Sequence, residues 1–194
     1  MDKSIFLFIN GLAGRNAVMD GFFRGVSNDY FALVSCCFIL VWLWFGLKNE
    51  KQRLVMQKTV LVAAISIGLT AALVGIVNHF YFRPRPFNVL PPDTVTLLFY
   101  KPTDSSFPSN LASILFAAAW PVFIKNKTWG SIMLAIDVLA GFGRVFIGVH
   151  YPLDILGGAG IAVVGTACAF GAMWLIGPLE RFLVGLLRAI HLAQ

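Results

Sequence analysis

Five long stretches with few or no charged side chains constrain this chain more than any other feature of its sequence. A helix that crosses the hydrocarbon core of a bilayer needs about 20 mostly apolar residues. The stretches that approach or exceed this length are Tyr30–Leu47, Thr59–Phe82, Ser105–Ile124, Trp129–Gly148 and Ile155–Leu179, and the membrane part of the third is expected to begin near Asn110. Charged residues make up 12% of the chain, against about 25% in a soluble domain. The sequence therefore predicts an all-α, polytopic transmembrane bundle that forms a single membrane-embedded domain over residues 1–194.

Both ends of the chain have patterns that are typical of helices lying at the membrane interface. Near the N-terminus, apolar residues in Ile5–Ile9 and Met19–Val26 are interrupted by glycines and by Arg15. Near the C-terminus, apolar residues between Leu179 and Ile190 recur at the spacing i, i+3, i+4, i+7. This spacing gives a helix one apolar face. We therefore expect interfacial helices at both ends, the C-terminal one on the inner leaflet.

The net charge of +6 is interpreted loop by loop rather than as an affinity for nucleic acid, because most of the surface is expected to face lipid. If the five spans alternate in direction, most loop cations fall on one side of the membrane, which the positive-inside rule makes cytoplasmic. These cations are Lys48, Lys51, Arg53, Lys58, Lys125, Lys127, Arg181 and Arg188. The Arg83–Phe107 loop and the turn at His150 then face outward. Several cations remain on that outward side, and a phosphate ligand would explain them.

The first polar segment of the outward side is Tyr81–Phe87, at the mouth of the second predicted span. In it, Arg83 and Arg85 alternate with prolines. The planar guanidinium group matches two phosphate oxygens at once and stays charged at any relevant pH. These arginines are therefore candidate phosphate ligands. The alternative, that they anchor the chain at lipid headgroups, stays open.

Two further polar segments lie on the same side. Pro108 and Ser109 come just before the third predicted span, where the free N–H groups of a helix start attract anions, although simple capping of that helix is the alternative. His150 and Asp154 are four residues apart at the start of the fifth span. At that spacing the carboxylate could accept the imidazole N–H and leave the other ring nitrogen free to act as a nucleophile. Arg144 precedes His150 by six residues. The alternative for this segment is an interfacial histidine beside a snorkelling arginine.

Together these segments resemble the three signature motifs of the type 2 phosphatidic acid phosphatase superfamily. The first motif is Lys, six residues, Arg-Pro; here Arg85-Pro86 match and Asn78 stands in the place of the Lys. The second motif is Pro-Ser-Gly-His. Pro108-Ser109 match it, while Asn110 and Leu111 replace the Gly and the His.

The third motif is Ser-Arg, five residues, His, three residues, Asp. Arg144, His150 and Asp154 match it at the right spacing, with Gly143 in the place of the Ser. The Arg83–Phe87 run, followed by a Phe-Pro-Ser segment, is also similar to the bacitracin-resistance branch of the family, the undecaprenyl pyrophosphate phosphatases. The resemblance implies a bacterial plasma-membrane enzyme that recycles the carrier lipid of cell-wall peptidoglycan synthesis.

The resemblance also implies a mechanism. His150 attacks the terminal phosphorus of a lipid diphosphate in the bilayer while Asp154 orients the ring. Arg85, Arg144 and the Ser109 region hold the phosphoryl oxygens and stabilise their charge in the transition state. Water then hydrolyses the phosphohistidine. No metal ion or other cofactor is implied, because guanidinium groups supply the positive charge.

Leu111 is the departure that matters most, because the family's histidine at this position protonates the leaving group. General acid catalysis of this kind is worth roughly 10²–10⁴-fold in rate. The sequence leaves two interpretations open: an impaired or inactivated phosphatase, or a non-catalytic protein that binds lipid phosphates. A glycerophospholipid phosphatase is a further alternative. Asn78 removes a second expected cation, so phosphate binding would depend more on Arg83, and Asp137 in the fourth span has no assigned role.

Overall fold

The computed structural model describes residues 1–175, which form helices and contain no strand. The α-helices are α1 (Asp2–Asn10), α2 (Ala17–Val26), α3 (Phe31–Phe45), α4 (Glu50–Phe80), α5 (Pro86–Val89), α6 (Asn110–Lys125), α7 (Lys127–Phe146) and α8 (Pro152–Leu175), with a 3-10 turn at Pro92–Thr94. The predicted all-α class is confirmed. The C-terminal interfacial helix predicted after Leu179 lies outside the described residues.

The five predicted spans coincide with helices α3, α4, α6, α7 and α8. By length and composition, α4, α7 and α8 can each cross a membrane alone. Helices α2 and α3 would qualify together as one broken span bent by 50°, and α6 is a shorter apolar helix. A multi-pass membrane protein is therefore supported, while the number of five spans stays a prediction.

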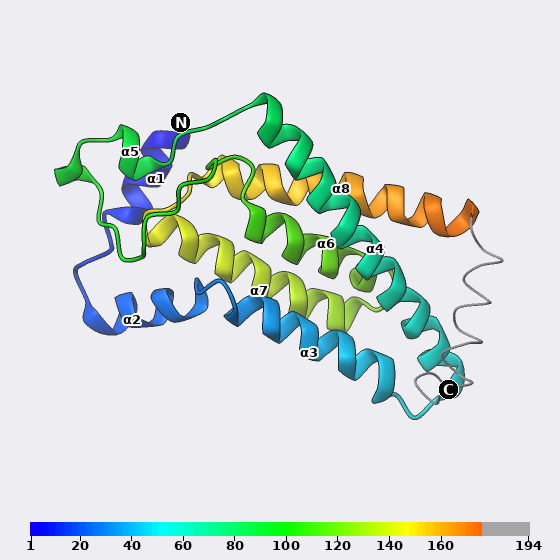
Figure 1. The fold of residues 1–194 in the computed structure, drawn as a ribbon. Coiled ribbons are helices and arrows are strands. Elements are labelled where there is room, and N and C mark those ends of the chain that lie inside the picture. Colours follow the sequence, from blue (N-terminus) through cyan, green and yellow to red (C-terminus); the bar gives the residue numbers. More distant parts are fainter. Residues whose placement is uncertain (176–194) are drawn as a thin grey trace.

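The long helices run side by side, and the short helices gather at one end of them (Figure 1). Helix α6 lies at the centre, in contact with α4, α7 and α8. Four of its alanines, at positions 112, 117, 118 and 119, are buried, and such small side chains let helix backbones approach closely where lipid provides no hydrophobic driving force. Helices α4 and α8 are joined by a buried hydrogen bond of 2.8 Å between the hydroxyls of Ser66 and Thr166. This packing fixes the relative positions of the helix ends that carry the polar segments.

Side-chain caps explain where several helices begin. Asn49, Ser109 and Asn126 each stand just before a helix and accept a hydrogen bond from one of its free N–H groups. The cap at Ser109 starts α6 directly after the Pro108-Ser109 pair. The second polar segment is thereby held at the end of the bundle where α7 ends and α8 begins.

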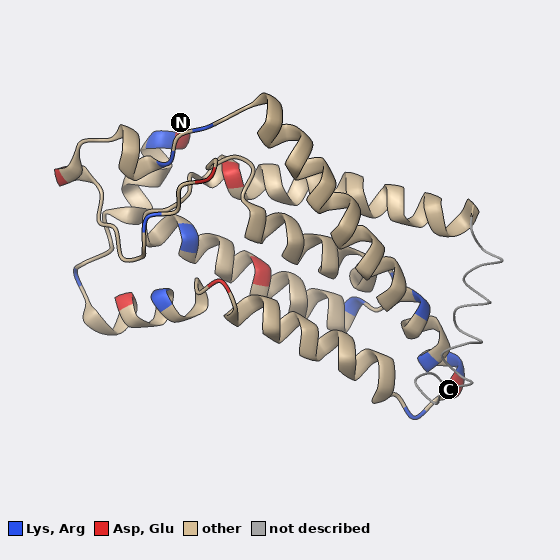
Figure 2. Cartoon of the chain, viewed as in Figure 1, with Lys and Arg blue, Asp and Glu red and all other residues tan. Residues whose placement is uncertain are grey.

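Charged residues concentrate at the two ends of the bundle, apart from one acidic position midway along α7 (Figure 2). That residue is Asp137, which is fully buried and accepts a hydrogen bond of 3.6 Å from the Cys36 thiol of α3. It lies about two helical turns from Arg144. Asp137 thus belongs to the packing of α3 against α7 and not to the polar cluster at the bundle end.

The N-terminal helix α1 closes the end of the bundle that holds the polar segments. Its Asn10 side chain is fully buried and donates hydrogen bonds of 2.8 Å to the carbonyls of Thr96 and Phe146. Phe6 is also buried and packs against Tyr151, with 5.3 Å between the ring centroids. One face of α1 is therefore covered by protein. In α2 the apolar side chains of Val18 and Phe22 are exposed, as expected of a helix at the interface.

Candidate active site

His150 lies in the short link between α7 and α8, where a tight turn brings the chain back toward the bundle. Gly148 in this link has a φ of 90°, a conformation that favours glycine, and a Cβ there would lie 2.8 Å from the Thr96 carbonyl oxygen. Asp154 follows in the first turn of α8, which begins at Pro152. Its Oδ2 accepts a hydrogen bond of 2.8 Å from the Tyr151 N–H. The turn and the helix start together bury both His150 and Asp154.

The hydrogen bonds of the imidazole ring define which nitrogen is reactive. Nδ1 lies 2.9 Å from the carbonyl oxygen of Ser106. A carbonyl only accepts, so Nδ1 carries the proton and Nε2 keeps its lone pair. The Asp154 carboxylate lies farther from Nδ1, at 3.5 Å. The sequence predicted that Asp154 itself would accept this N–H, and the structure places a backbone carbonyl closer instead.

Asp154 acts on this arrangement through Ser106. The Ser106 hydroxyl donates to Asp154 Oδ2 at 2.5 Å, while the carbonyl of the same residue holds the imidazole. Arg83 Nη1 donates to Asp154 Oδ1 at 2.6 Å. Asp154 is thus satisfied by three donors and fixes the serine that orients the ring.

Arg83, which the sequence predicted to be a substrate ligand, is held by two carboxylates of the protein. One terminal nitrogen binds Asp154 and the other binds Asp2 Oδ2 at 2.6 Å. Its guanidinium also lies over the Tyr151 ring, 4.2 Å from the ring centroid. Asp2 in turn accepts from the Leu153 N–H at 3.0 Å. Arg83 therefore ties α1 and α8 together behind Asp154.

The unprotonated nitrogen of His150, Nε2, faces two residues that the sequence singled out. Arg85 Nη1 donates to Nε2 at 3.2 Å, and the Ser109 hydroxyl lies 3.5 Å from the same nitrogen. Arg85 is buried and also donates to the carbonyl of Val149 at 3.0 Å. Ser109 is held against α8, because its N–H donates to the Asp154 carbonyl at 3.1 Å. The two backbones also approach closely at Gly158, where a Cβ would lie 3.0 Å from the carbonyl oxygen of Ser109. The first, second and third polar segments thus meet at His150 Nε2.

Arg144 reaches the same region from the last turn of α7. It is buried, pairs with Asp29 and lies over the Phe99 ring, 5.0 Å from the ring centroid. Its Nε is buried and has no partner among the described residues. One N–H of this buried arginine therefore has no acceptor within residues 1–175.

The remaining predicted positions lie around this cluster. The Asn110 amide donates to Asp104 at 3.1 Å. Pro108 is buried between Ser106 and Ser109. Leu111 is half-buried and packs on the apolar core that α3, α6 and α7 share. The Oδ1 of Asn78, in the last turn of α4, is buried without a hydrogen-bond partner among residues 1–175.

The protonation state of His150 follows from its burial. Burial lowers the pKa of the imidazole, the nearby Asp154 raises it, and the positive charges of Arg85 and Arg144 lower it further, with a lower pKa as the net result. The ring is therefore neutral at pH 7, which is the form a nucleophile needs. Within the described part of the chain, no three His, Cys, Asp or Glu side chains are grouped as a metal site. The prediction of a metal-free reaction is left untested by that observation.

Four acidic residues of this region were missed as partners by reasoning from the sequence. Asp2, Asp29 and Asp104 each bind one of the three arginines, and Asp154 was expected only beside His150. No spacing signal connects Asp2 to Arg83 or Asp29 to Arg144, because the members of each pair lie on different elements.

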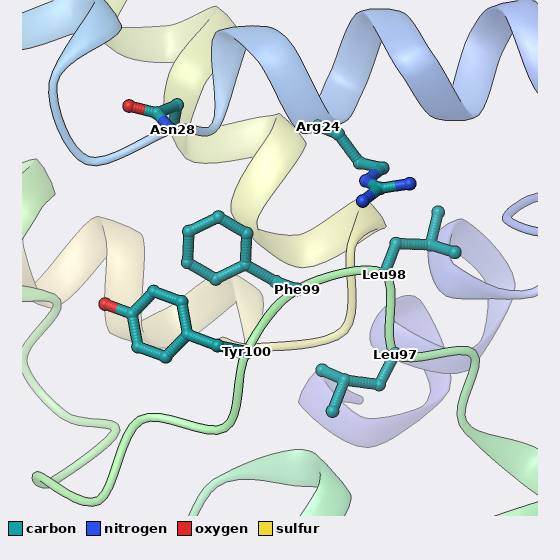
Figure 3. A pocket seen from close by; sticks show the side chains of 6 residues that line it. All are labelled: Arg24, Asn28, Leu97, Leu98, Phe99 and Tyr100. Carbon is teal, nitrogen blue, oxygen red and sulfur yellow. The ribbon is translucent and has the colours of Figure 1, made fainter.

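A surface pocket of about 550 Å³ lies beside the Arg144–Asp29 pair, lined by Arg24, Asn28 and the segment from Leu97 to Tyr100 (Figure 3). Tyr100 donates a hydrogen bond of 2.8 Å to Asp29, and Phe99 contacts Arg144. The pocket wall is thus the outer support of Arg144. His150 does not line this pocket.

The chain as a whole is similar to known proteins in sequence and in fold. The PAP2 superfamily matches residues 59–179. The chain is 31% identical to undecaprenyl-diphosphatase BcrC of Bacillus subtilis over 98% of its own length and 93% of that protein. It is 26% identical to the putative undecaprenyl-diphosphatase YbjG of Escherichia coli, with 87% and 81% covered. The crystal structure of Aquifex aeolicus LpxE superposes with a TM-score of 0.69 at 27% identity, covering 88% of this chain and 94% of LpxE.

Proposed function

Because this chain belongs to the PAP2 superfamily, we propose that it is a polyprenyl diphosphate phosphatase that converts undecaprenyl diphosphate to undecaprenyl phosphate through a phosphohistidine at His150. The observation that carries the proposal is the unprotonated Nε2 of the buried His150, whose lone pair faces Arg85 and Ser109 while Nδ1 is held by the Ser106 carbonyl. Relatives named as undecaprenyl-diphosphatases support this substrate.

The reaction has two displacements at phosphorus. In the first, the Nε2 lone pair forms a bond to the terminal phosphorus, and the bond from that phosphorus to the bridging oxygen breaks, which releases lipid monophosphate. In the second, water attacks the phosphohistidine and the P–N bond electrons return to Nε2, which releases inorganic phosphate. Arg85 and Arg144 stabilise the oxygens of the transferring group, as expected for catalysis dominated by electrostatics.

Leu111 favours a diphosphate over a phosphate monoester as the substrate. No proton donor stands at this position, so the leaving group must depart without the family's histidine. A lipid monophosphate is a far better leaving group than the alkoxide of a monoester, and it needs the proton less. Leu111 is also the observation that favours the second candidate function, a protein that binds lipid phosphates without turning them over.

The proposed site faces outward across a bacterial plasma membrane. This orientation rests on the lysines and arginines of the loops at the opposite end of the bundle, which the positive-inside rule places in the cytoplasm. The product would then be carrier lipid available for another round of cell-wall synthesis.

The test is phosphate release by the purified chain in detergent from undecaprenyl diphosphate, phosphatidic acid and phosphatidylglycerol phosphate. The expected result is release from the diphosphate above that from the monoesters, and none from the His150→Ala variant. A radiolabelled phosphoenzyme trapped by acid-free quenching should also disappear in His150→Ala. Binding of the diphosphate without release would support the binding protein, and preference for a glycerophospholipid would support the alternative substrate class.

A further inference from the structure

The two arginines proposed to hold the substrate phosphate each carry a carboxylate from a loop. Arg85 Nη2 donates to Asp104 Oδ1 at 2.8 Å, and Arg85 Nε donates to the backbone carbonyl of the same residue at 3.1 Å. Arg144 is paired with Asp29, which lies between α2 and α3. The carboxylate oxygens thus accept from guanidinium N–H groups that phosphoryl oxygens would otherwise use.

These two pairs differ from the pair that Arg83 forms with Asp154. The side chain of Asp154, which binds Arg83, is 0% exposed and has three donors. The Asp104 side chain is 49% exposed and that of Asp29 is 37% exposed, whereas both arginine side chains are nearly fully buried. An exposed carboxylate on a buried arginine can leave into water, because water replaces its hydrogen bonds. The Asp154 carboxylate is fully buried, so water cannot replace its hydrogen bonds in this way.

A bound phosphoryl group would compete with these carboxylates for the arginines. Three guanidinium groups, those of Arg83, Arg85 and Arg144, face four carboxylates in ion pairs, and His150 is neutral. In the empty site each of these guanidinium groups is therefore already paired with at least one carboxylate. A diphosphate dianion or trianion could not bind well in such a site unless at least one carboxylate withdrew from its arginine.

We propose that Asp104 and Asp29 are exchange residues for the phosphate site: they hold Arg85 and Arg144 in place when the site is empty, leave when a phosphoryl group binds, and return to displace inorganic phosphate. This proposal rests on the proposed function for the identity of the ligand. The Asn110 amide and the Tyr100 hydroxyl also bind these two carboxylates and guide their return. The Nε of Arg144 is buried without a hydrogen-bond partner among the described residues, so it is a further donor for a phosphoryl oxygen once Asp29 has left.

The exchange gives product release a physical basis. Inorganic phosphate bound between two buried arginines would leave slowly, because its departure would strand two buried charges. A carboxylate that replaces each departing oxygen keeps both guanidinium groups paired throughout. Competition by the carboxylates lowers the equilibrium affinity for every phosphate ligand, and the same competition shortens the time for which product stays bound.

The experiment is equilibrium binding of inorganic phosphate to the purified full-length protein, measured by isothermal titration calorimetry. Asp104→Asn and Asp29→Asn remove the competing charge and keep the size of each side chain. We expect each variant to lower the Kd about threefold to tenfold, the scale of an exposed ion pair, and the double variant to lower it further. Asp93→Asn is the matched control, because Asp93 carries the same charge on the loop that also bears Asp104 and has no ion pair with these arginines.

The outcomes separate the exchange from a general effect of charge. Tighter binding in Asp104→Asn and Asp29→Asn, with the Kd of Asp93→Asn within twofold of the parent, supports the proposal. A Kd that is unchanged or raised in both variants, or lowered equally in Asp93→Asn, overturns it. Binding is read without turnover, so a chain that releases no phosphate from lipid would refute the phosphatase and still test the exchange. Thermal unfolding of each variant checks that these loop changes leave the fold intact.

Discussion

Replacing Leu111 by histidine should restore the proton donor that the proposed site lacks. Ser109 caps α6 and Asn110 is its first residue, so position 111 lies in the first helical turn, two residues from the hydroxyl that faces His150 Nε2. A general acid there is worth about 10²-fold or more in turnover, equivalent to about 2.7 kcal/mol of transition-state stabilisation. The gain should be larger for a phosphate monoester, because an alkoxide leaving group depends more on protonation.

The loss of folding stability caused by Leu111→His should be small enough to leave the variant folded. Leu111 is half-buried against the core of α3, α6 and α7, so losing its apolar contacts costs about 1 kcal/mol of folding stability. The start of a helix also disfavours a positive charge by about 0.3–1 kcal/mol, which lowers the pKa of the new histidine somewhat. Only its protonated form donates, so the acceleration should be greatest near pH 6 and should fade toward pH 8.

The assay is steady-state phosphate release from undecaprenyl diphosphate and from phosphatidic acid at several pH values. Leu111→Gln is the matched control, since it adds a polar side chain of similar length that cannot transfer a proton. Equal acceleration by Leu111→Gln would refute proton donation as the cause. A folded Leu111→His variant that binds diphosphate but gains no turnover would place the defect elsewhere, with Asn78 as the first residue to examine.

Further outcomes follow from the same geometry. Since burial lowers the pKa of His150, the acid limb of the pH profile of kcat/KM should lie below about 6.5, the ordinary pKa of histidine. Activity should be retained above the lowered pKa and lost as the pH falls through it. An acid limb above about 6.5 would contradict a neutral nucleophile. Asp154→Asn should slow phosphoenzyme formation about tenfold or more, because the Ser106 hydroxyl and Arg83 lose a charged acceptor, and rapid-quench labelling measures this; an unchanged rate would show that Ser106 is held without the carboxylate. An impermeant thiol reagent should label Asp93→Cys in intact cells and spare Glu50→Cys, and the reverse pattern would invert the proposed topology.

Local patterns of the sequence were sufficient for the class of fold and for the family. Transfer of a helix into lipid depends on the sum of its own side chains, so the uncharged stretches could be located without knowledge of their neighbours. Motif spacing located His150, Asp154, Arg85 and Ser109, and the structure brings these four residues together. Capping by Ser109 could also be anticipated, because it involves residues within one turn.

Which group holds each side chain of the site was decided only by the tertiary structure. Ser106 meets His150 across 44 residues, Arg83 meets Asp154 across 71, and Asn10 meets Phe146 across 136. Such contacts depend on how the bundle ends are packed, and no periodicity within a segment encodes them. Arg83 and Arg85 look equivalent in the sequence, two residues apart between prolines. Their contacts diverge because the irregular backbone of residues 81–85 places one guanidinium at Asp2 and Asp154 and the other at His150 and Asp104.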